Sequence, residues 1–319
     1  MNKLLISKNA IKSDIIIEKL SKKFNIEFFE RNIIIKNIAN LEKFSVWIHF
    51  DTLITDRLMN FQDQLQFLIT TTTSTTHISP RFYMANQEKI ISLKPLIHKM
   101  NDISSTAEHA WALMMTYHHK ILEANNSVKL GEWSRDKFIR RNQLRNSTIG
   151  IIGLGRLGTI TKNYAEAFGA NVVVNEINVH KKISSKFKRI KFLNLNDLLE
   201  QSDYVFLHAS TAENATPIIN NEILSKIKNP FVLINTSRGK LVDERAILKF
   251  LKKGLIRAYL TDVLKIEDEK SKNSNSKLIT SKNLKNKIMI TPHIGGASLD
   301  AMYYCENLLY QELIERSKL

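Results

Sequence analysis

The sequence contains almost no cysteine and no long apolar runs. Cys305 is the only cysteine, so no internal disulfide can form and a reducing compartment is expected. No uninterrupted run of about 18 apolar residues occurs, so we expect no membrane-spanning helix. The apolar part of residues 1–14 is too short for a signal peptide. These absences together indicate a cytoplasmic protein without a membrane partner.

Metal ligands in a recognisable pattern are also missing. Adjacent His118 and His119 lie near the end of a predicted helix, where the helix dipole favours histidine, and this explains them better than a metal does. We therefore expect no metal site.

Acidic residues are few compared with basic ones, and the formal net charge is +16. Such a charge indicates either a nucleic-acid partner or a lysine-rich composition spread over solvated faces. The basic residues form several small groups, at 19–23, 181–191 and 270–287, and none is interleaved with aromatic residues as a single-strand binder requires. We therefore expect no nucleic-acid partner. The charge can instead attract small anionic substrates.

Glycine is scarce too, yet four of the 10 glycines fall within residues 150–158, GIIGLGRLG. The apolar run 148–152 precedes Gly153-x-Gly155-x-x-Gly158, and the β-branched run 172–174 follows, with Glu176 directly after it. Between them lies an apolar stripe at helical spacing that ends at Gly169: Leu157, Ile160, Tyr164 and Phe168. Strand, glycine turn, helix, strand and acid together predict one βαβ unit.

Each part of this unit has a role in binding a dinucleotide. Gly153 allows the tight turn, Gly155 lets the backbone approach a pyrophosphate, and Gly158 lets the helix pack on the strand. The helix N-terminus offers unpaired N–H groups and the positive end of its dipole to phosphates. Glu176 can accept hydrogen bonds from a ribose diol. A bare structural turn is the alternative, but the surrounding unit favours a bound dinucleotide.

The N-terminal part predicts a small α/β domain with a parallel sheet. Short strands are expected at 3–6, 26–29, 47–50 and 67–70, with a helix at 15–20. The polar stretch 71–77, TTTSTTH, follows the last of these strands. It is either an ordinary loop or a site that holds a carboxylate, because open α/β sheets bind ligands at the carboxyl ends of their strands.

After Glu176 the alternation of strands and helices continues, with strands expected at 204–208, 231–235, 258–261 and 287–291. Arg238, Asp262 and His293 lie just past the ends of three of them, so a parallel sheet would bring them to one crevice. The candidate reacting residues are Arg238, Glu267 and His293, and each alone has an ordinary alternative: a surface arginine, a loop acid and a capping histidine. As a set they suit acid–base chemistry on a carboxylate substrate, because arginine grips a carboxylate and histidine titrates near neutral pH.

Several motifs, in order, resemble the D-isomer-specific 2-hydroxyacid dehydrogenases, the phosphoglycerate dehydrogenase-like family. They are NDISSTAEH at 101–109, the glycine fingerprint at 150–158, LINTSRG at 233–239, Asp262 with Glu267, and TPHIGG at 291–296. The resemblance covers roughly residues 65–300. The first 60 residues match the family only in pattern.

The resemblance implies a role for each matched residue. Arg238 would bind the substrate carboxylate and keto oxygen, and His293, paired with Glu267, would be the acid and base. Backbone amides near Thr73, Ser74 and Thr75 would bind the substrate carboxylate. Asp262 would hold the nicotinamide carboxamide. The full set of residues expected to contact the cofactor, NAD, is Gly153, Gly155, Arg156, Leu157, Gly158, Glu176, His208, Thr236 and Asp262.

The sequence departs from the family pattern at three places. Ser74 stands where the substrate loop of the family usually has glycine. The stretch 207–220 lacks the usual proline and threonines, and Asp268 replaces the proline that usually follows the catalytic glutamate. All three proposed catalytic residues are nevertheless present.

We therefore expect a Rossmann-type, doubly wound parallel sheet domain, residues 101–293, that binds NAD. It is inserted into a smaller flavodoxin-like α/β substrate domain, residues 1–100 plus 294–319. The expected function is hydride transfer between nicotinamide and C2 of a D-2-hydroxy acid or 2-keto acid, with phosphohydroxypyruvate, hydroxypyruvate and glyoxylate as candidate substrates. The alternative is a corepressor-like binding protein that senses dinucleotides with little turnover. A homodimer is expected through the helix at 105–119 and the arm at 121–147, which carries Trp133 and Phe138.

Overall fold

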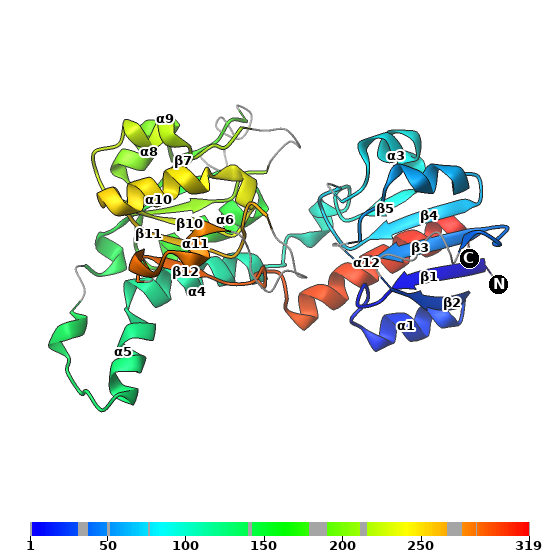
Figure 1. The fold of residues 1–319 in the computed structure, drawn as a ribbon, viewed down its shortest axis with the longest axis horizontal. Coiled ribbons are helices and arrows are strands. Elements are labelled where there is room, and N and C mark those ends of the chain that lie inside the picture. Colours follow the sequence, from blue (N-terminus) through cyan, green and yellow to red (C-terminus); the bar gives the residue numbers. More distant parts are fainter. Residues whose placement is uncertain are drawn as a thin grey trace. The chain divides into compact units, whose positions relative to one another are not determined.

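The fold contains two parallel β-sheets, which belong to separate parts of the chain (Figure 1). The computed structural model describes residues 2–30, 38–49, 52–75, 77–139, 142–178, 190–210, 216–266, 276–284 and 286–318. Contacts divide the chain into a first unit, Met1–Ile103 with Ala297–Leu319, and a second unit, Ser104–Gly296. Among the described residues, none of the helices has the length and apolar character needed to cross a membrane.

The first unit has a five-stranded sheet. Its strands are β1 (Asn2–Ser7), β2 (Phe24–Phe29), β3 (Phe44–Ile48), β4 (Leu65–Thr70) and β5 (Ile90–Ser92). Its helices are α1 (Asp14–Ser21), α3 (Pro80–Ala85) and α12 (Leu299–Ser317). The strand order β2-β1-β3-β4-β5, parallel throughout, is that of flavodoxin-like folds and confirms the predicted class.

Alternating side chains of these strands build a core on each face of the first sheet. Leu4 and Ile6 of β1 pack with Leu309 and Leu313 of α12 on one face, which α1 also covers. Leu5 points to the other face, where α3 and the 3₁₀ turn Asp56–Phe61 cover the sheet. Helix α1 begins after Ser13, whose hydroxyl accepts a bond from the N–H of Ile16.

The second unit has a seven-stranded sheet. Its strands are β6 (Thr148–Ile152), β7 (Asn171–Asn175), β8 (Lys191–Phe192), β9 (Tyr204–Leu207), β10 (Phe231–Asn235), β11 (Ile256–Thr261) and β12 (Ile288–Ile290). Its helices are α4 (Ser105–His118), α5 (Ile121–Lys129), α6 (Arg156–Ala167), α8 (Leu195–Gln201), α9 (Asn221–Ser225), α10 (Glu244–Lys253) and α11 (Lys277–Thr280).

The order β12-β11-β10-β9-β6-β7-β8 makes this sheet doubly wound. The chain runs outward from β6 through β7 to β8, then returns to pair β9 with the other side of β6. A topological switch point therefore lies between β6 and β9, where such sheets bind ligands at the carboxyl ends of their strands. The predicted Rossmann-type architecture is confirmed.

Helices cover both faces of the second sheet, so its strands are apolar on both sides. Helices α4 and α6 pack on one face, where Trp111 contacts Tyr164, Phe168 and Phe206. Helices α8, α9, α10 and α11 pack on the other. Figure 1 shows α8, α9 and α10 on the side of the sheet away from α4. All strands of this sheet are parallel, so their carboxyl ends share one edge.

Candidate active site

The glycine turn that follows β6 uses each of its glycines for a different physical reason. Gly153 has φ +93°, and a Cβ there would lie 2.9 Å from backbone atoms of His208 and Ala209. A Cβ on Gly158 would lie 2.1 Å from the carbonyl oxygen of Gly153, so helix α6 packs directly on the turn. A Cβ on Gly155 would meet nothing within 4 Å. Gly155 therefore faces open space, into which a ligand can come close to the backbone.

Helix α6 begins at Arg156, and its N-cap residue is Gly155, which has no side chain to form a cap bond. The first N–H groups of a helix have no partner within the helix, and the positive end of the dipole lies there. Arg156 and Leu157 occupy this first turn. The space beside Gly155 and the start of α6 together suit a pyrophosphate.

Glu176 follows β7 and is buried against the glycine turn. Its Oε2 accepts the N–H of Leu154 at 2.8 Å, and its Oε1 accepts the N–H of Asn178 at 2.9 Å. These bonds fix the carboxylate beside the glycine turn. Because each carboxylate oxygen has a second acceptor position, Glu176 can also accept bonds from a ribose diol.

His208 and Thr236 each bring a buried polar atom to the carboxyl edge of the sheet. His208 follows β9, and its Nε2 lies 2.8 Å from the hydroxyl of Thr161 on α6. Burial lowers the pKa of His208 to about 4, so its ring is neutral at pH 7. Its Nδ1 and the hydroxyl of Thr236 have no hydrogen-bond partner among the described residues. Buried polar atoms are normally paired, so such atoms at the carboxyl edge of the sheet fit a site that a ligand completes.

Arg238 and His293 are exposed residues beyond the ends of β10 and β12. The Arg238 guanidinium donates to the carbonyl of Ser237 at 2.7 Å. His293 has φ +55°, in the left-handed region, and its N–H donates to the carbonyl of Asp262 at 3.0 Å. Glu267, the predicted partner of His293, lies outside the described residues. The structure thus places Arg238 and His293 at the same edge of the sheet as the glycine turn.

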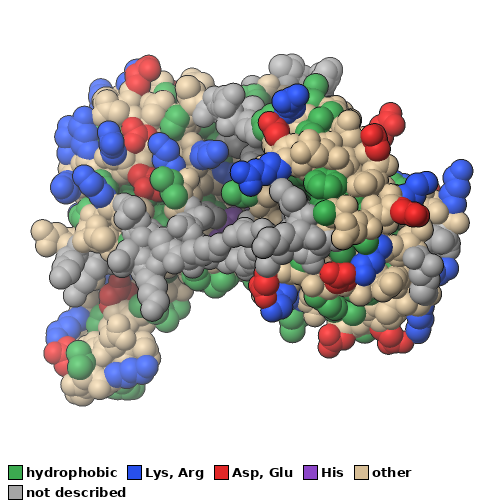
Figure 2. All heavy atoms as spheres, turned by 45° about the vertical axis from the view of Figure 1, so that its right-hand side comes forward, with side chains coloured by type: hydrophobic (Ala, Val, Ile, Leu, Met, Phe, Trp, Pro, Cys, Tyr) green, Lys and Arg blue, Asp and Glu red, His purple; other side chains and the backbone are tan. Residues whose placement is uncertain are grey.

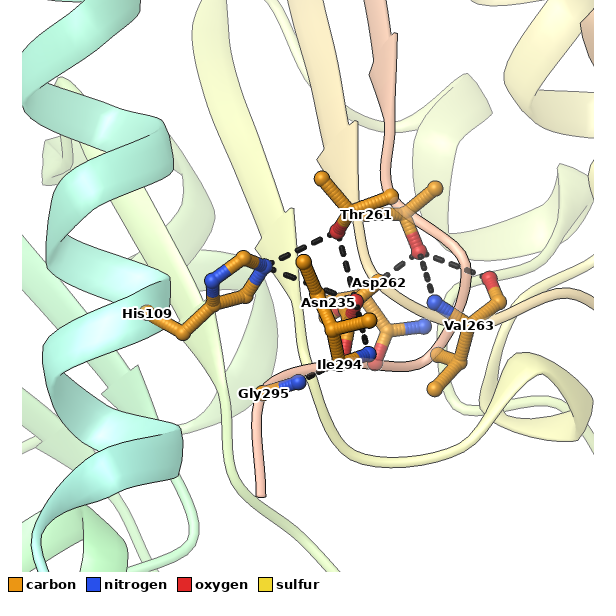
Figure 3. A network of polar contacts seen from close by, with 8 residues as sticks. His109, Asn235, Thr261, Asp262, Val263, Ile294 and Gly295 are labelled. Atoms are coloured by element: carbon orange, nitrogen blue, oxygen red, sulfur yellow. Dashed lines mark hydrogen bonds and ion pairs between the residues drawn. The ribbon is translucent and has the colours of Figure 1, made fainter. Parts of the chain in front are cut away.

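Asp262 follows β11, and its side chain is only 1% exposed. Its Oδ1 accepts the hydroxyl of Thr291 at 2.6 Å and the N–H of Ile294 at 2.9 Å. Its Oδ2 accepts the N–H of Gly295 at 2.7 Å. Figure 3 shows His109 of α4 pointing toward this carboxylate, and its Nε2 lies 3.4 Å from Oδ1.

The predicted substrate loop, with Thr73, Ser74 and Thr75, follows β4 in the first unit. Its residues are half-buried, and the N–H of Ile78 donates to the carbonyl of Thr75 at 2.9 Å. The hydroxyl of Thr72 donates to the carbonyl of Ser74. The loop therefore has internal bonds of its own at the carboxyl end of the first sheet.

The structure adds three residues that were not predicted for the site: Thr161, His109 and Thr291. Thr161 is fully buried and contacts His208. His109 and Thr291 contact each other and Asp262. His109 and Thr291 lie inside the motifs 101–109 and 291–296, so their position in those motifs was the available signal. Thr161 carries no motif and could be found only from the fold.

Comparisons with known proteins show which proteins the chain is similar to. The family model described as "D-isomer specific 2-hydroxyacid dehydrogenase, NAD binding domain" matches residues 111–295. A glyoxylate reductase of Thermofilum pendens is 29% identical over 213 residues, which cover 66% of this chain and 61% of that protein. A D-3-phosphoglycerate dehydrogenase of Archaeoglobus fulgidus is 31% identical over 214 residues, 67% of this chain and 39% of that protein. The chain thus spans less than two thirds of the length of these relatives.

Solved structures match over nearly the whole chain. A D-lactate dehydrogenase from Aquifex aeolicus, complexed with NAD and lactic acid, has a TM-score of 0.81 at 22% identity, covering 99% of this chain and 96% of that one. An acyclic imino acid reductase in complex with NADPH and D-Arg has a TM-score of 0.79 at 26% identity, with the same coverage. The likeness to the D-lactate dehydrogenase shows that the fold of the whole chain, both units included, is a known one.

Proposed function

Because the chain belongs to the D-isomer-specific 2-hydroxyacid dehydrogenase family, we propose that it is an NAD-dependent oxidoreductase acting on C2 of a D-2-hydroxy acid or 2-keto acid. The observation that carries the proposal is the glycine turn at the switch point, with open space at Gly155 and the carboxylate of Glu176 fixed beside it. This arrangement fits a dinucleotide with a free ribose diol. The first unit would bind the substrate and the second the cofactor. The single cysteine supports a cytoplasmic location.

Residues at the carboxyl edge of the second sheet would each hold a different part of the cofactor. NAD, when bound, accepts or supplies the hydride. Gly155 and the start of α6 would hold its pyrophosphate, Glu176 its ribose, and His208 and Thr236 would contact it through their unpaired atoms. Asp262 was assigned to the carboxamide from the family, and its carboxylate is already bonded within the chain.

The chain's own groups would handle charge and protons on the substrate. In reduction the keto oxygen becomes negative as C2 is reduced, and Arg238 would stabilise that charge while also binding the carboxylate. His293 would then give its proton to the oxygen, and in oxidation it would accept that proton. Glu267 would favour the protonated ring. Backbone amides near Thr73, Ser74 and Thr75 would hold the substrate carboxylate.

The candidate substrates are glyoxylate, hydroxypyruvate and phosphohydroxypyruvate. Relatives named glyoxylate reductase and D-3-phosphoglycerate dehydrogenase support this choice. The test follows the loss of NADH absorbance at 340 nm with each keto acid. His293→Ala should lower the rate about 10²- to 10⁴-fold and leave NADH affinity nearly unchanged. His98→Ala, at an exposed histidine in the first unit, serves as the matched control. Full activity of His293→Ala would remove this mechanism.

The corepressor-like alternative gives a different result in the same assay. A dinucleotide-sensing protein would bind NADH with normal affinity yet turn over none of the keto acids. Titration of NADH by intrinsic fluorescence, run beside the rate assay, separates binding without turnover from a protein that does not bind at all.

Glu176 should make the protein prefer NADH to NADPH. A carboxylate at the ribose repels a 2′-phosphate and accepts bonds from a free diol. Lys181 and Lys182, which could receive that phosphate, lie outside the described residues. The preference should disappear in Glu176→Ala, as measured by dissociation constants for both cofactors. Tighter binding of NADPH to the unmodified protein would contradict the assignment.

We also propose that the protein forms a homodimer through α4 and the arm at 121–147, which begins with α5. Large apolar side chains are exposed along α5 and the arm, and their exposure would be costly on a monomer: Ile121, Leu122, Val128, Leu130, Trp133 and Ile139. Trp133 is 90% exposed. Light scattering should therefore give twice the chain mass of 36.8 kDa.

The dimer proposal has a matched pair of variants. Leu130→Asp changes an exposed apolar residue in the arm, whereas Met84→Asp changes an exposed apolar residue on α3, which is outside the arm. The first should produce monomers at micromolar concentration and the second should not. A wild-type protein that is monomeric at this concentration would refute the proposal.

A further inference from the structure

A chain of polar contacts connects helix α4 to the loop that carries His293, which we call the histidine loop (residues 292–296). His109 Nε2 lies 2.9 Å from the Thr291 hydroxyl, and that hydroxyl donates to Asp262 Oδ1 at 2.6 Å. The Asp262 carboxylate in turn accepts the N–H groups of Ile294 and Gly295. Figure 3 shows His109, Ile294 and Gly295 around Asp262. A side chain of α4 thus contacts, in two steps, the backbone on the carboxyl side of His293.

The contacts among His109, Thr291 and Asp262 fix which atom donates and which accepts in each hydrogen bond of this network. A hydroxyl has a single hydrogen, and Thr291 directs it to the Asp262 carboxylate. The Thr291 oxygen can therefore only accept from His109, so Nε2 of His109 must carry a hydrogen. All donors point toward Asp262. Hydrogen bonds that run in one direction polarise one another, so the bond from Thr291 to Asp262 strengthens the bond from His109 to Thr291.

Asp262 has little capacity left for a ligand. Its two oxygens have about four acceptor positions in all, and three internal bonds occupy three of them, while His109 Nε2 lies 3.4 Å from Oδ1. The side chain is 1% exposed. A Cβ on Gly295 would lie 2.9 Å from Oδ2, so the loop also closes tightly over the carboxylate. Asp262 is therefore built to anchor the loop.

The anchored loop holds His293 in a conformation that it would not keep unaided. A non-glycine residue at φ +55° is uncommon and has to be fixed by its surroundings. Asp262 supplies this restraint on both sides, because its carbonyl accepts the N–H of His293 and its carboxylate accepts the next two N–H groups. These bonds therefore restrain the backbone from which the His293 ring projects.

We propose that His109 and Thr291 are positioning residues that act through Asp262 to hold the histidine loop, and with it His293, in one orientation. The inference rests on the proposed function, in which His293 transfers the proton. It assigns to α4 a role in the reaction that is separate from its proposed role in the dimer.

The first test compares Thr291→Val with Thr291→Ser. Valine has the shape of threonine without the hydroxyl, so both the bond to Asp262 and the bond from His109 are lost, whereas serine keeps them. Thr291→Val should lower kcat roughly 10- to 100-fold, since a small misplacement of a reacting group has an effect of that size. NADH affinity should change less than about two-fold, because the glycine turn follows β6, three strands away from β11. Thr291→Ser should recover most of kcat.

The second test uses His109→Leu, which removes the donor, with His109→Gln, which retains an N–H donor, as the conservative variant. His109→Leu should lower kcat, and the double variant with Thr291→Val should be no worse than Thr291→Val alone, since both changes break the same chain. Effects on kcat that multiply would show that the two residues act separately, and this would overturn the proposal. Equal kcat in Thr291→Val and wild type would overturn it too.

Hydrogen exchange of the ligand-free protein tests the network without reference to activity. The amides of Ile294 and Gly295 should exchange faster in Thr291→Val and His109→Leu than in wild type, while amides of β6 should be unaffected. Unchanged exchange at Ile294 and Gly295 refutes the network even if the enzyme is active. If exchange is faster in the two variants but the wild-type protein turns over none of the keto acids, the network stands and the proposed function is refuted.

Discussion

At the scale of single residues, the glycine turn separates the demands of folding from those of binding. Gly155 has φ −77° and open space around its Cβ position, so alanine fits there without strain. Gly155→Ala should therefore leave the free energy of unfolding nearly unchanged and weaken NADH binding, because the added methyl group occupies the space proposed for the pyrophosphate. Urea unfolding and NADH titration on the same sample give both quantities.

Gly158→Ala is the matched control for that variant. Its Cβ would overlap the Gly153 carbonyl at 2.1 Å, so the helix must move away from the turn. Overpacking of this kind destabilises a fold by roughly 1–3 kcal/mol, and NADH binding should fall together with stability. Normal NADH affinity in Gly155→Ala would place the pyrophosphate elsewhere.

His208 makes stability depend on pH. Burial lowers its pKa from 6.5 to about 4, and Nδ1 is buried even though part of the residue reaches the surface. Because the folded-state pKa lies below the unfolded value, the unfolded chain binds the proton more tightly. The stabilisation is therefore complete above pH 6.5 and is lost as the pH falls toward 4, with a loss of roughly 2 kcal/mol at pH 5.

A variant isolates this effect from the other groups that titrate in the same range. His208→Gln can still bond to Thr161 but carries no titrating ring. Urea unfolding at pH 7 and pH 5 should show a larger loss for wild type than for His208→Gln, by about that 2 kcal/mol. Equal losses would mean that the ring is hydrated in the folded protein.

At the scale of elements, α12 is attached to α1 through a buried carboxylate. Glu306 accepts the N–H groups of Lys12 at 2.8 Å and Ser13 at 3.0 Å, just before α1 begins. Burial raises the pKa of Glu306, and these two bonds oppose that rise. Glu306→Ala would leave both N–H groups without their acceptor, and we expect the first unit to lose roughly 1–3 kcal/mol of stability.

Glu312→Ala is the control on the same helix. Glu312 pairs with Arg316 at the helix surface, where a salt bridge contributes under about 1 kcal/mol. Urea unfolding followed by tryptophan fluorescence, to which the buried Trp47 of the first unit contributes, compares the two variants. A Glu306→Ala protein as stable as Glu312→Ala would show that α12 is held by its apolar side alone.

Helix α6 shows what the sequence could and could not predict about an element. Its position was predictable, because glycines bound it and apolar residues recur at helical spacing. Its buried face was not, since the fully buried residues are Gly158, Thr161 and Ala165. Close packing on the glycine turn requires small residues there. Part of the apolar stripe, Tyr164 and Phe168, contacts Trp111 on α4 instead, a contact that depends on the tertiary fold.

The N-cap residue of α4 lies one position before the one that the sequence pattern predicts. The S-x-x-E pattern predicts a capping box between Ser105 and Glu108. The helix instead has Ser104 as its N-cap residue, and the Ser104 hydroxyl bonds to the Glu108 carboxylate. Two consecutive serines make the boundary ambiguous in sequence, and only the backbone dihedral angles decide it.

At the scale of the whole molecule, the alternation of strands and helices predicted two parallel sheets. The order of the strands and the contacts between segments far apart in the sequence came only from the structure. The sequence places Arg238, Asp262 and His293 after separate strands, which was enough to expect them at one edge. It could not show that Asp262 is enclosed, because the groups that enclose it come from α4 and from the loop after β12. The roles of Glu267 and of the two units remain predictions.

The net charge of +16 is a property of the whole chain that the fold does not explain. Figure 2 shows Lys and Arg side chains in separate groups on one face, with Asp and Glu near them. The described part of α10 has Lys252 and Lys253 in its last turn, where they also favour the helix dipole. The long-range field of such a chain attracts small anions, whichever residues carry the charge.

This field predicts that catalysis depends on salt in a specific way. The proposed keto acid substrates are anions, so kcat/KM for them should fall as ionic strength rises past about 0.15 M, where the screening length is about 8 Å. The value of kcat should stay constant, because saturated enzyme needs no attraction. Phosphohydroxypyruvate carries more negative charge than glyoxylate, so its kcat/KM should fall more steeply. Sucrose at equal osmolarity is the control for effects that do not come from charge. Equal slopes for the two substrates would mean that only local contacts, such as Arg238 with the carboxylate, guide the substrate.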